Sequence, residues 1–194
     1  MLEDERDPAP HLADAGAPRI ATHQGAARFA YADPPYLGMC GRYDHFHPDG
    51  RCWDDIETHR LLIARLIERY DYWALSLHSV SLKPILALCP DDVRIAPWVK
   101  PFAVFRPGVN PAFAWEPVIF RGRKMGKERD TVRDWVSANI TMQRGTIGAK
   151  PAAFCRWLFD VLGMTPDDDF TDLFHGSGGV KREHEAWRSQ TRLS

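Results

Sequence analysis

The sequence has few of the features that mark secreted, membrane-spanning or uniformly basic proteins. Its four cysteines are scattered and form no disulfide framework, which favours reduced thiols and a cytoplasmic protein. No apolar run approaches the ~20 residues that a membrane helix needs. The first 26 residues are acidic and rich in proline and alanine, without the apolar core of a signal peptide. We expect this stretch to be a disordered tail and expect no membrane partner.

What the chain does have suits a single α/β domain. Its 194 residues are 44% hydrophobic, and residues 27–194 are enough to bury one core without staples. Strand-like and helix-like segments alternate, which predicts a parallel sheet with helices on both faces. Strands are expected at 28–32, 71–78, 92–100 and 169–174, and residues 112–124 are expected to form a strand or one arm of a hairpin. Helices are expected at 54–70, 81–90, 150–163 and 180–190. The segment 125–148 is expected to be mainly loop.

Charge is unevenly distributed along the chain, although the net charge is only −1. Between Lys100 and Pro151 there are ten Lys and Arg residues against four acids. The densest part contains Arg121, Arg123 and Lys124, which are candidates for contact with nucleic-acid phosphates. A solvated loop between strands is the alternative explanation.

Two short stretches fall where strands are expected to end. In "RFAYADPPYLG", prolines 34 and 35 end a strand and fix Asp33 and Tyr36 just beyond it. In "DLFHGSGG", Gly176 and Gly178 form a turn before a helix, where a backbone without Cβ atoms can approach a ligand closely. This turn is neither a dinucleotide-binding fingerprint nor a phosphate-binding loop.

Together, "DPPY" and the Phe-x-Gly-x-Gly turn resemble the two motifs that define S-adenosylmethionine-dependent amino-group methyltransferases. The helix beginning at Lys150-Pro151 resembles the Lys-Pro helix that precedes the cofactor strand in that family. The order of the motifs is that of the circularly permuted adenine methyltransferases of bacteria and phages, with relatives that methylate mRNA. The resemblance therefore implies a minimal, circularly permuted Rossmann-like sheet whose cofactor strand lies near the C-terminus.

The same resemblance implies a mechanism. The lone pair of the exocyclic amino group of adenine is delocalised into the ring, so this group is a poor nucleophile. Asp33 and the Pro34 carbonyl would accept its two hydrogens, Pro35 would keep these acceptors in place, and Tyr36 would stack on the extruded base. The initial Asp favours adenine over cytosine. Lys150, Asp172, Phe174, Gly176 and Gly178 would bind S-adenosylmethionine, although Asp172 as a turn cap and Lys150 as a surface charge are alternatives.

Other aromatic and histidine residues are candidates for contact with the substrate. Trp115 is a candidate for stacking on the target base, with a plain core position as the alternative. Glu116, next to it, is either a polar residue of the pocket or the partner of a nearby arginine. His45 and His47 lie in a polar loop that is expected to close over the base. With Cys40 and Cys52 they also form a possible zinc set, but the spacing matches no common zinc finger, so we expect no metal.

The sequence leaves three functions open. The first is an adenine N6-methyltransferase acting on DNA, as a monomer or homodimer, in restriction–modification or a phage. The second is a nucleic-acid-binding protein on a degenerate methyltransferase scaffold. The third is the same chemistry with RNA as substrate.

Overall fold

The computed structural model describes residues 26–39, 50–102, 107–124, 126, 130–140, 149–176 and 178–192. Nearly all of the tail expected at 1–26 lies outside these ranges. The strands are β1 (Arg28–Ala32), β2 (Tyr72–Ser76), β3 (Arg94–Val99), β4 (Trp115–Arg121), β5 (Val136–Ser137) and β6 (Asp169–Asp172). The α-helices are α1 (Ile56–Arg69), α2 (Leu82–Leu86), α3 (Ala152–Leu162) and α4 (Gly179–Thr191), and η2 (Gly50–Asp54) and η3 (Ser79–Ser81) are short 3-10 helices. The expected strands and helices are therefore confirmed, and β5 is a short addition within the expected loop.

The six strands form one mixed sheet in the order β5-β3-β4-β2-β1-β6. β1 is parallel to both of its neighbours, β2 and β6, but β4 is antiparallel to β2 and β3. The expectation of a parallel sheet is therefore wrong for β4, whereas its antiparallel pairing with β3 agrees with the hairpin arm that the sequence left open for residues 112–124. The physical reason lies in the connection from β3 to β4, whose described residues contain no helix that could carry a parallel crossover. The antiparallel direction brings the first residues of β4 to the edge at which β1, β2 and β6 end, which we call the carboxyl edge.

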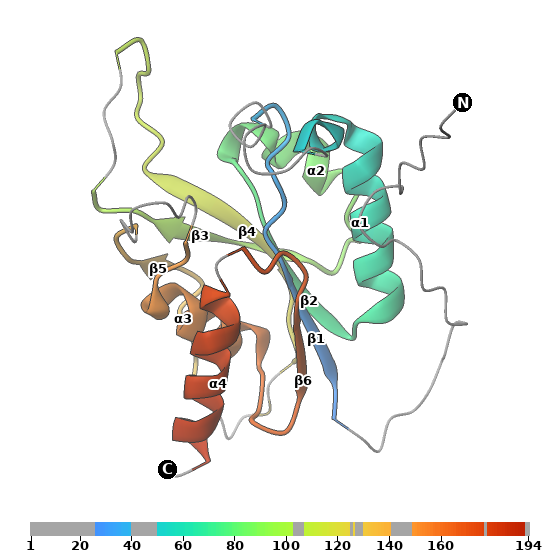
Figure 1. Ribbon diagram of the computed structural model, residues 1–194, viewed down its shortest axis with the longest axis vertical. Coiled ribbons are helices and arrows are strands. Elements are labelled where there is room, and N and C mark those ends of the chain that lie inside the picture. Colours follow the sequence, from blue (N-terminus) through green and yellow to red (C-terminus); the bar gives the residue numbers. More distant parts are fainter. Residues whose placement is uncertain are drawn as a thin grey trace, which may run out of the picture.

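Helices cover both faces of the sheet, as the sequence predicts (Figure 1). The period of two along a strand sends Phe29 and Tyr31 to one face, where they pack with residues of α3 and α4. Ala30 and Ala32 face the other way, toward α1 and α2. Each strand of the centre is thus buried on both sides, which explains why its sequence is a continuous apolar run rather than an alternating one.

The ends of the helices follow from local sequence. Asp55 caps α1, because its side chain accepts a hydrogen bond from the Glu57 amide. Gly163 ends α3 with a φ of 74°, a left-handed conformation that favours glycine. Within the described part of the chain, no helix combines the length and the apolar character that a bilayer crossing requires.

Asp168 holds the edge of the sheet opposite the carboxyl edge. Its buried carboxylate accepts hydrogen bonds from the Ala27 amide at 3.1 Å and from the amide and hydroxyl of Thr165 at 2.7 and 2.8 Å. Arg123 donates to the same carboxylate at 2.7 Å, while its guanidinium lies 5.0 and 5.4 Å from the ring centroids of Phe29 and Tyr72. Burial alone would raise the pKa of Asp168, but these donors outweigh burial and lower it. Asp168 therefore joins the starts of β1 and β6 to the chain that follows β4.

We predict that Asp168→Asn lowers the free energy of unfolding by about 1–3 kcal/mol at pH 7, because buried donors lose a charged acceptor. Since the folded-state pKa is lowered, this stabilisation is present above the ordinary carboxyl pKa and is lost as the pH falls through the lowered value. Urea unfolding of both proteins between pH 7 and pH 3 measures the difference, which should shrink in acid. The control is Asp167→Asn, at a side chain that is 84% exposed. Equal losses in the two variants would contradict the prediction.

Candidate active site

Asp33 lies directly beyond β1, at the carboxyl edge, and Pro34 is buried behind it. The chain then turns, with the Met39 amide donating to the Tyr36 carbonyl at 2.9 Å. Because β1 and β6 are parallel neighbours, with Tyr31 opposite Asp172, the end of β6 lies beside Asp33. The strand-ending prolines thus place a carboxylate and a phenol ring where two buried strands end together.

The Tyr36 hydroxyl lies between two carboxylates. It is 3.0 Å from Asp33 Oδ1 and 3.1 Å from Glu116 Oε2. One hydroxyl hydrogen can be donated to only one of these oxygens at a time. Glu116 is the second residue of β4 and comes from the strand whose direction the sequence did not predict.

Two lysine ammonium groups balance these carboxylates. Lys150 Nζ lies 3.0 Å from Asp33 Oδ1, 3.2 Å from the Tyr36 hydroxyl and 3.6 Å from Glu116 Oε2. Lys100, which follows β3, donates to Glu116 Oε1 at 2.7 Å. We call Asp33, Tyr36, Lys100, Glu116 and Lys150 the Asp33 cluster. Lys150, which the sequence assigned to the cofactor or the surface, is only 4% exposed and contacts the predicted catalytic carboxylate.

Aromatic rings surround the Lys150 ammonium group. Its nitrogen lies 5.1 Å from the ring centroid of Trp98, 5.8 Å from that of Phe154 and 5.9 Å from that of Tyr36. Ring faces attract cations, and the rings also exclude water from the ion pairs. The electrostatic interactions within the cluster are therefore stronger than those of a surface ion pair.

The two carboxyl groups of the cluster have different acidities. Burial raises the pKa of Asp33, as does the neighbouring Glu116, and the Lys150 ammonium opposes them only in part. Burial would also raise the pKa of Glu116, but Lys150 and Lys100 together outweigh burial and lower it. Burial, together with Asp33 and Glu116, raises the pKa of Tyr36 well above its usual value. Asp33 is therefore the more basic carboxylate and Tyr36 stays a phenol.

The end of β6 and the glycine turn that follows it lie beside this cluster, and the last residue of β6, Asp172, has an unpaired acceptor oxygen. Asp172 is buried, and its Oδ1 accepts from the Phe174 amide at 3.3 Å. Its Oδ2 is also buried but has no hydrogen-bond partner among the described residues. Burial is the main cause that raises the pKa of Asp172. Gly176 and Gly178 follow with φ values of 45° and 72°, which favour glycine.

Aromatic residues that sequence analysis did not assign lie next to Tyr36. The ring of His78 lies 6.5 Å from that of Tyr36 and 4.5 Å from that of Phe113, centroid to centroid. Trp115, a predicted stacking residue, begins β4 and is 40% exposed. His78 follows the end of β2, and that position was a signal in the sequence for a site at the carboxyl edge.

Arg121, Arg123 and Lys124 lie at the other edge of the sheet. Arg121 pairs in register with Trp73 near the start of β2, and its Nε lies 2.8 Å from Asp92 Oδ2. Arg123 is engaged by Asp168, and Lys124 is exposed. The structure therefore does not bring these residues together with Asp33, because β4 runs antiparallel. Their predicted contact with nucleic acid gains no support from this placement.

Most of the predicted polar loop lies outside the residues that the structure describes. Cys40, His45 and His47 lie beyond the described residues, and Cys52 is exposed. Within the ranges that the structure describes, no group of three or more His, Cys, Asp or Glu residues could hold a metal. The roles proposed for these histidines stay predictions.

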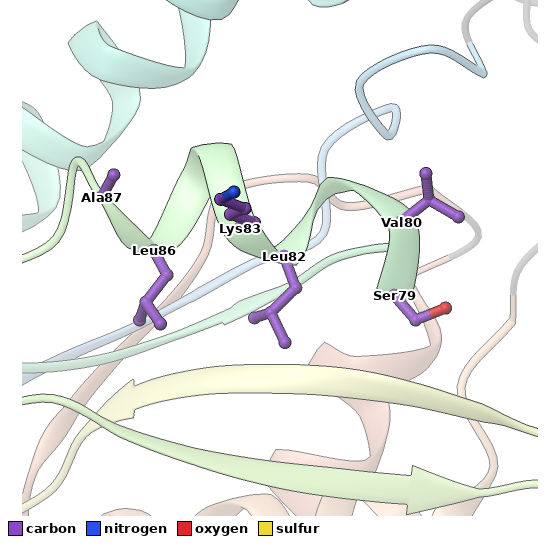
Figure 2. A pocket seen from close by; sticks show the side chains of 6 residues that line it. All are labelled: Ser79, Val80, Leu82, Lys83, Leu86 and Ala87. Carbon is purple, nitrogen blue, oxygen red and sulfur yellow. The ribbon is translucent and has the colours of Figure 1, made fainter.

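An open, largely apolar groove of about 520 Å³ runs along η3 and α2 (Figure 2). Val80, Leu82 and Leu86 are among its lining residues, and Figure 2 shows Leu82 and Leu86 pointing to the same side of α2. None of the site residues predicted from the sequence lines it. The groove is therefore distinct from the Asp33 cluster, although its first lining residue, Ser79, follows His78 directly.

Comparison with solved structures identifies the type of fold. No protein-family model matches the sequence, and no curated protein matches it. A crystal structure of M1.HpyAVI in complex with SAM superposes with a TM-score of 0.56 at 13% identity, covering 84% of this chain and 79% of that one. A second crystal structure of M1.HpyAVI gives a TM-score of 0.47 at 14% identity, covering 84% of this chain and 77% of that one. The first likeness shows that the chain has a methyltransferase fold.

We predict that Asp172→Asn stabilises the fold by about 1 kcal/mol at pH 8, because it removes a buried carboxylate with an unpaired oxygen. Since the folded-state pKa of Asp172 is raised, ionisation destabilises the native state above that pKa and has no effect below the unfolded-state value. The advantage of the variant should therefore decrease between pH 8 and pH 4, as measured by urea unfolding. Asp169→Asn, at the exposed start of the same strand, is the control and should show no such trend. A variant that is destabilised equally at both pH values would contradict the prediction.

Proposed function

We propose that the chain is an S-adenosylmethionine-dependent methyltransferase that transfers a methyl group to the exocyclic N6 of adenine in DNA. The proposed unit is one domain of residues 27–194, with the catalytic motif before the cofactor strand, in circularly permuted order. The observation that carries the proposal is the Asp33 cluster at the carboxyl edge of a methyltransferase fold, next to a glycine turn with an unpaired buried carboxylate oxygen.

The residues at the end of β6 fit the cofactor. S-adenosylmethionine binds as a net cation, since its sulfonium and α-ammonium groups outweigh one carboxylate. Lys150 and Lys100 are paired with the carboxylates of Asp33 and Glu116, so the negative charge left for this cation is that of Asp172 when ionised. In this proposal, Asp172 Oδ2 accepts hydrogen bonds from the cofactor. Phe174, Gly176 and Gly178 form the wall against it, and Lys150 acts on the substrate side. When bound, the cofactor supplies an electrophilic methyl group.

The residues of the cluster act on the amino group of the target base. The Asp33 carboxylate and the Pro34 carbonyl accept its two hydrogens, which localises the nitrogen lone pair for attack. As the new N–C bond forms, the methyl–sulfur bond of the bound cofactor would break and leave a neutral thioether, and the amino nitrogen would lose a proton. Asp33 is the basic acceptor of that proton, because burial raises its pKa. Tyr36 stacks on the base, and the hydrogen bond that its hydroxyl donates to Asp33 or Glu116 fixes the orientation of its ring. In this proposal Trp115, which precedes Glu116 in β4 and is exposed, adds a second aromatic surface.

The first test is transfer of labelled methyl groups onto unmethylated duplex DNA, single-stranded DNA and RNA, followed by separation of the nucleosides. Label on N6-methyladenosine from DNA is the expected result. Asp33→Ala should reduce the rate by at least about 100-fold and leave S-adenosylmethionine affinity nearly unchanged, because a preorganised acceptor is lost. Asp91→Ala, on an exposed turn, is the control.

Other outcomes of this assay would redirect the assignment. Label only on RNA would move the reaction to the other polymer. Absence of label together with absence of cofactor binding, in folded protein, would favour a nucleic-acid-binding protein on a degenerate scaffold. An Asp33→Ala protein with full activity would contradict the mechanism.

The glycine turn gives a second prediction. Gly176→Ala should weaken S-adenosylmethionine binding roughly tenfold, equivalent to ~1.4 kcal/mol, because φ at this position is 45° and a Cβ would enter the proposed cofactor wall. Among the described residues this Cβ would meet only the Phe174 carbonyl oxygen, at 3.9 Å, so the fold should survive. Calorimetric titration measures the affinity, and thermal unfolding checks the fold. Gly108→Ala, where φ is 76° and a Cβ meets no described atom within 4 Å, is the matched control, and an equal affinity in both variants would contradict the assignment.

A further inference from the structure

The Lys150 ammonium group and the Asp33 carboxylate form a donor and an acceptor side by side. The nitrogen lies 3.0 Å from Asp33 Oδ1, at the position proposed to receive the target base. Both interactions that Asp33 makes with described residues fall on Oδ1, so Oδ2 makes none of them. The pair thus presents an acceptor oxygen and an N–H donor in neighbouring positions.

This arrangement matches one edge of an amino-substituted heterocycle. In adenine the amino group lies next to ring nitrogen N1, and in cytosine it lies next to N3. In both bases the amino group is a donor and the ring nitrogen is an acceptor. Guanine and uracil carry an N–H at the corresponding ring position, which an ammonium group cannot accept. A base that leaves the stack is recognised by hydrogen bonds to this Watson–Crick edge.

We propose that Lys150 is a specificity-determining residue of the proposed reaction. Its ammonium group donates to the ring nitrogen next to the target amino group, while Asp33 accepts from the amino group itself. The inference rests on the proposed function and adds to it the part of the substrate that Lys150 recognises.

The surroundings of Lys150 suit this role. Glu116, 3.6 Å from Nζ, keeps the ammonium charge favourable after a neutral base has replaced part of its contact with Asp33. Lys100 in turn holds Glu116 in place at 2.7 Å. The rings of Trp98 and Phe154 shield the ammonium group from water, which strengthens a hydrogen bond to the base. An ammonium group turns about its last bond, so one hydrogen can be redirected without moving the chain.

The test compares oligonucleotides that contain one target adenine with matched ones that contain 1-deazaadenine, in which the ring nitrogen is replaced by C–H. The ratio of kcat/KM for the two substrates is measured for the wild type and for Lys150→Met. The wild type should prefer adenine by about tenfold to a hundredfold, because a hydrogen bond from a charged donor is lost with the analogue. Lys150→Met should reduce this preference by about tenfold to a hundredfold, down to the difference that the reactivity of the two bases alone produces. The analogue also changes the reactivity of its amino group, and the comparison between the two proteins cancels that effect.

Two controls make the test specific. 7-Deazaadenine lacks a nitrogen on the opposite edge, so both proteins should treat it as they treat adenine. Lys83→Met, at an exposed lysine of α2, should retain the wild-type preference. If Lys150→Met folds but transfers no methyl group, the same ratio is measured as binding affinity for the two oligonucleotides in the presence of S-adenosylhomocysteine, and a ratio near unity is expected.

The possible results distinguish a failure of the role proposed for Lys150 from a failure of the proposed function. A wild type that methylates adenine and 1-deazaadenine equally well overturns the role of Lys150 and leaves the proposed function standing. A Lys150→Met variant that keeps the full wild-type preference also overturns it. A wild type that methylates no adenine overturns the proposed function itself.

Discussion

The arrangement at the carboxyl edge depends on compensation of buried charge. Asp33, Glu116 and Lys150 come from segments that are far apart in the sequence, and each is largely removed from water. A buried charge without a partner destabilises a protein by several kcal/mol, so none of the three would be tolerated alone. Their mutual contacts at 3.0 and 3.6 Å therefore tie the end of β1, the start of β4 and the start of α3 to one another. The Tyr36 hydroxyl adds hydrogen bonds within the same group.

Much of this fold was predictable because the signals are local. The Pro-Pro pair after Arg28–Ala32 and the Gly163 cap of α3 each act within a few residues, and both fall where the sequence places them. The direction of β4 was not predictable in this way. It depends on how residues 100–114 connect two strands, and their sequence contains no clear sign of this connection. The sequence therefore indicated where strands lie but not how each one runs.

The same limit explains why the sequence left the role of Glu116 open and did not show that Arg121 lies at the opposite edge of the sheet from Asp33. Glu116 and Arg121 belong to one strand, and only its direction decides which of them reaches Asp33. The sequence favoured the basic end, because charge composition is visible along the chain and strand direction is not. Lys150 was noticed, but its contact with Asp33 joins residues that are more than a hundred positions apart. Such pairing is fixed by sheet order and not by local pattern.

The two edges of the sheet differ in how their buried carboxylates are satisfied. At one edge, the Asp168 carboxylate is saturated with donors, and it joins β1, β6 and the chain after β4. At the other edge, a buried oxygen of Asp172 has no partner among the described residues, and opposite charges are held close together. In related sequences, the balanced charges of the Asp33 cluster should make its charged positions depend on one another. Loss of one carboxylate would leave a buried ammonium group uncompensated, so positions 33, 100, 116 and 150 are expected to change together or not at all. Natural variation should preserve this set as a unit even where the surrounding surface diverges freely.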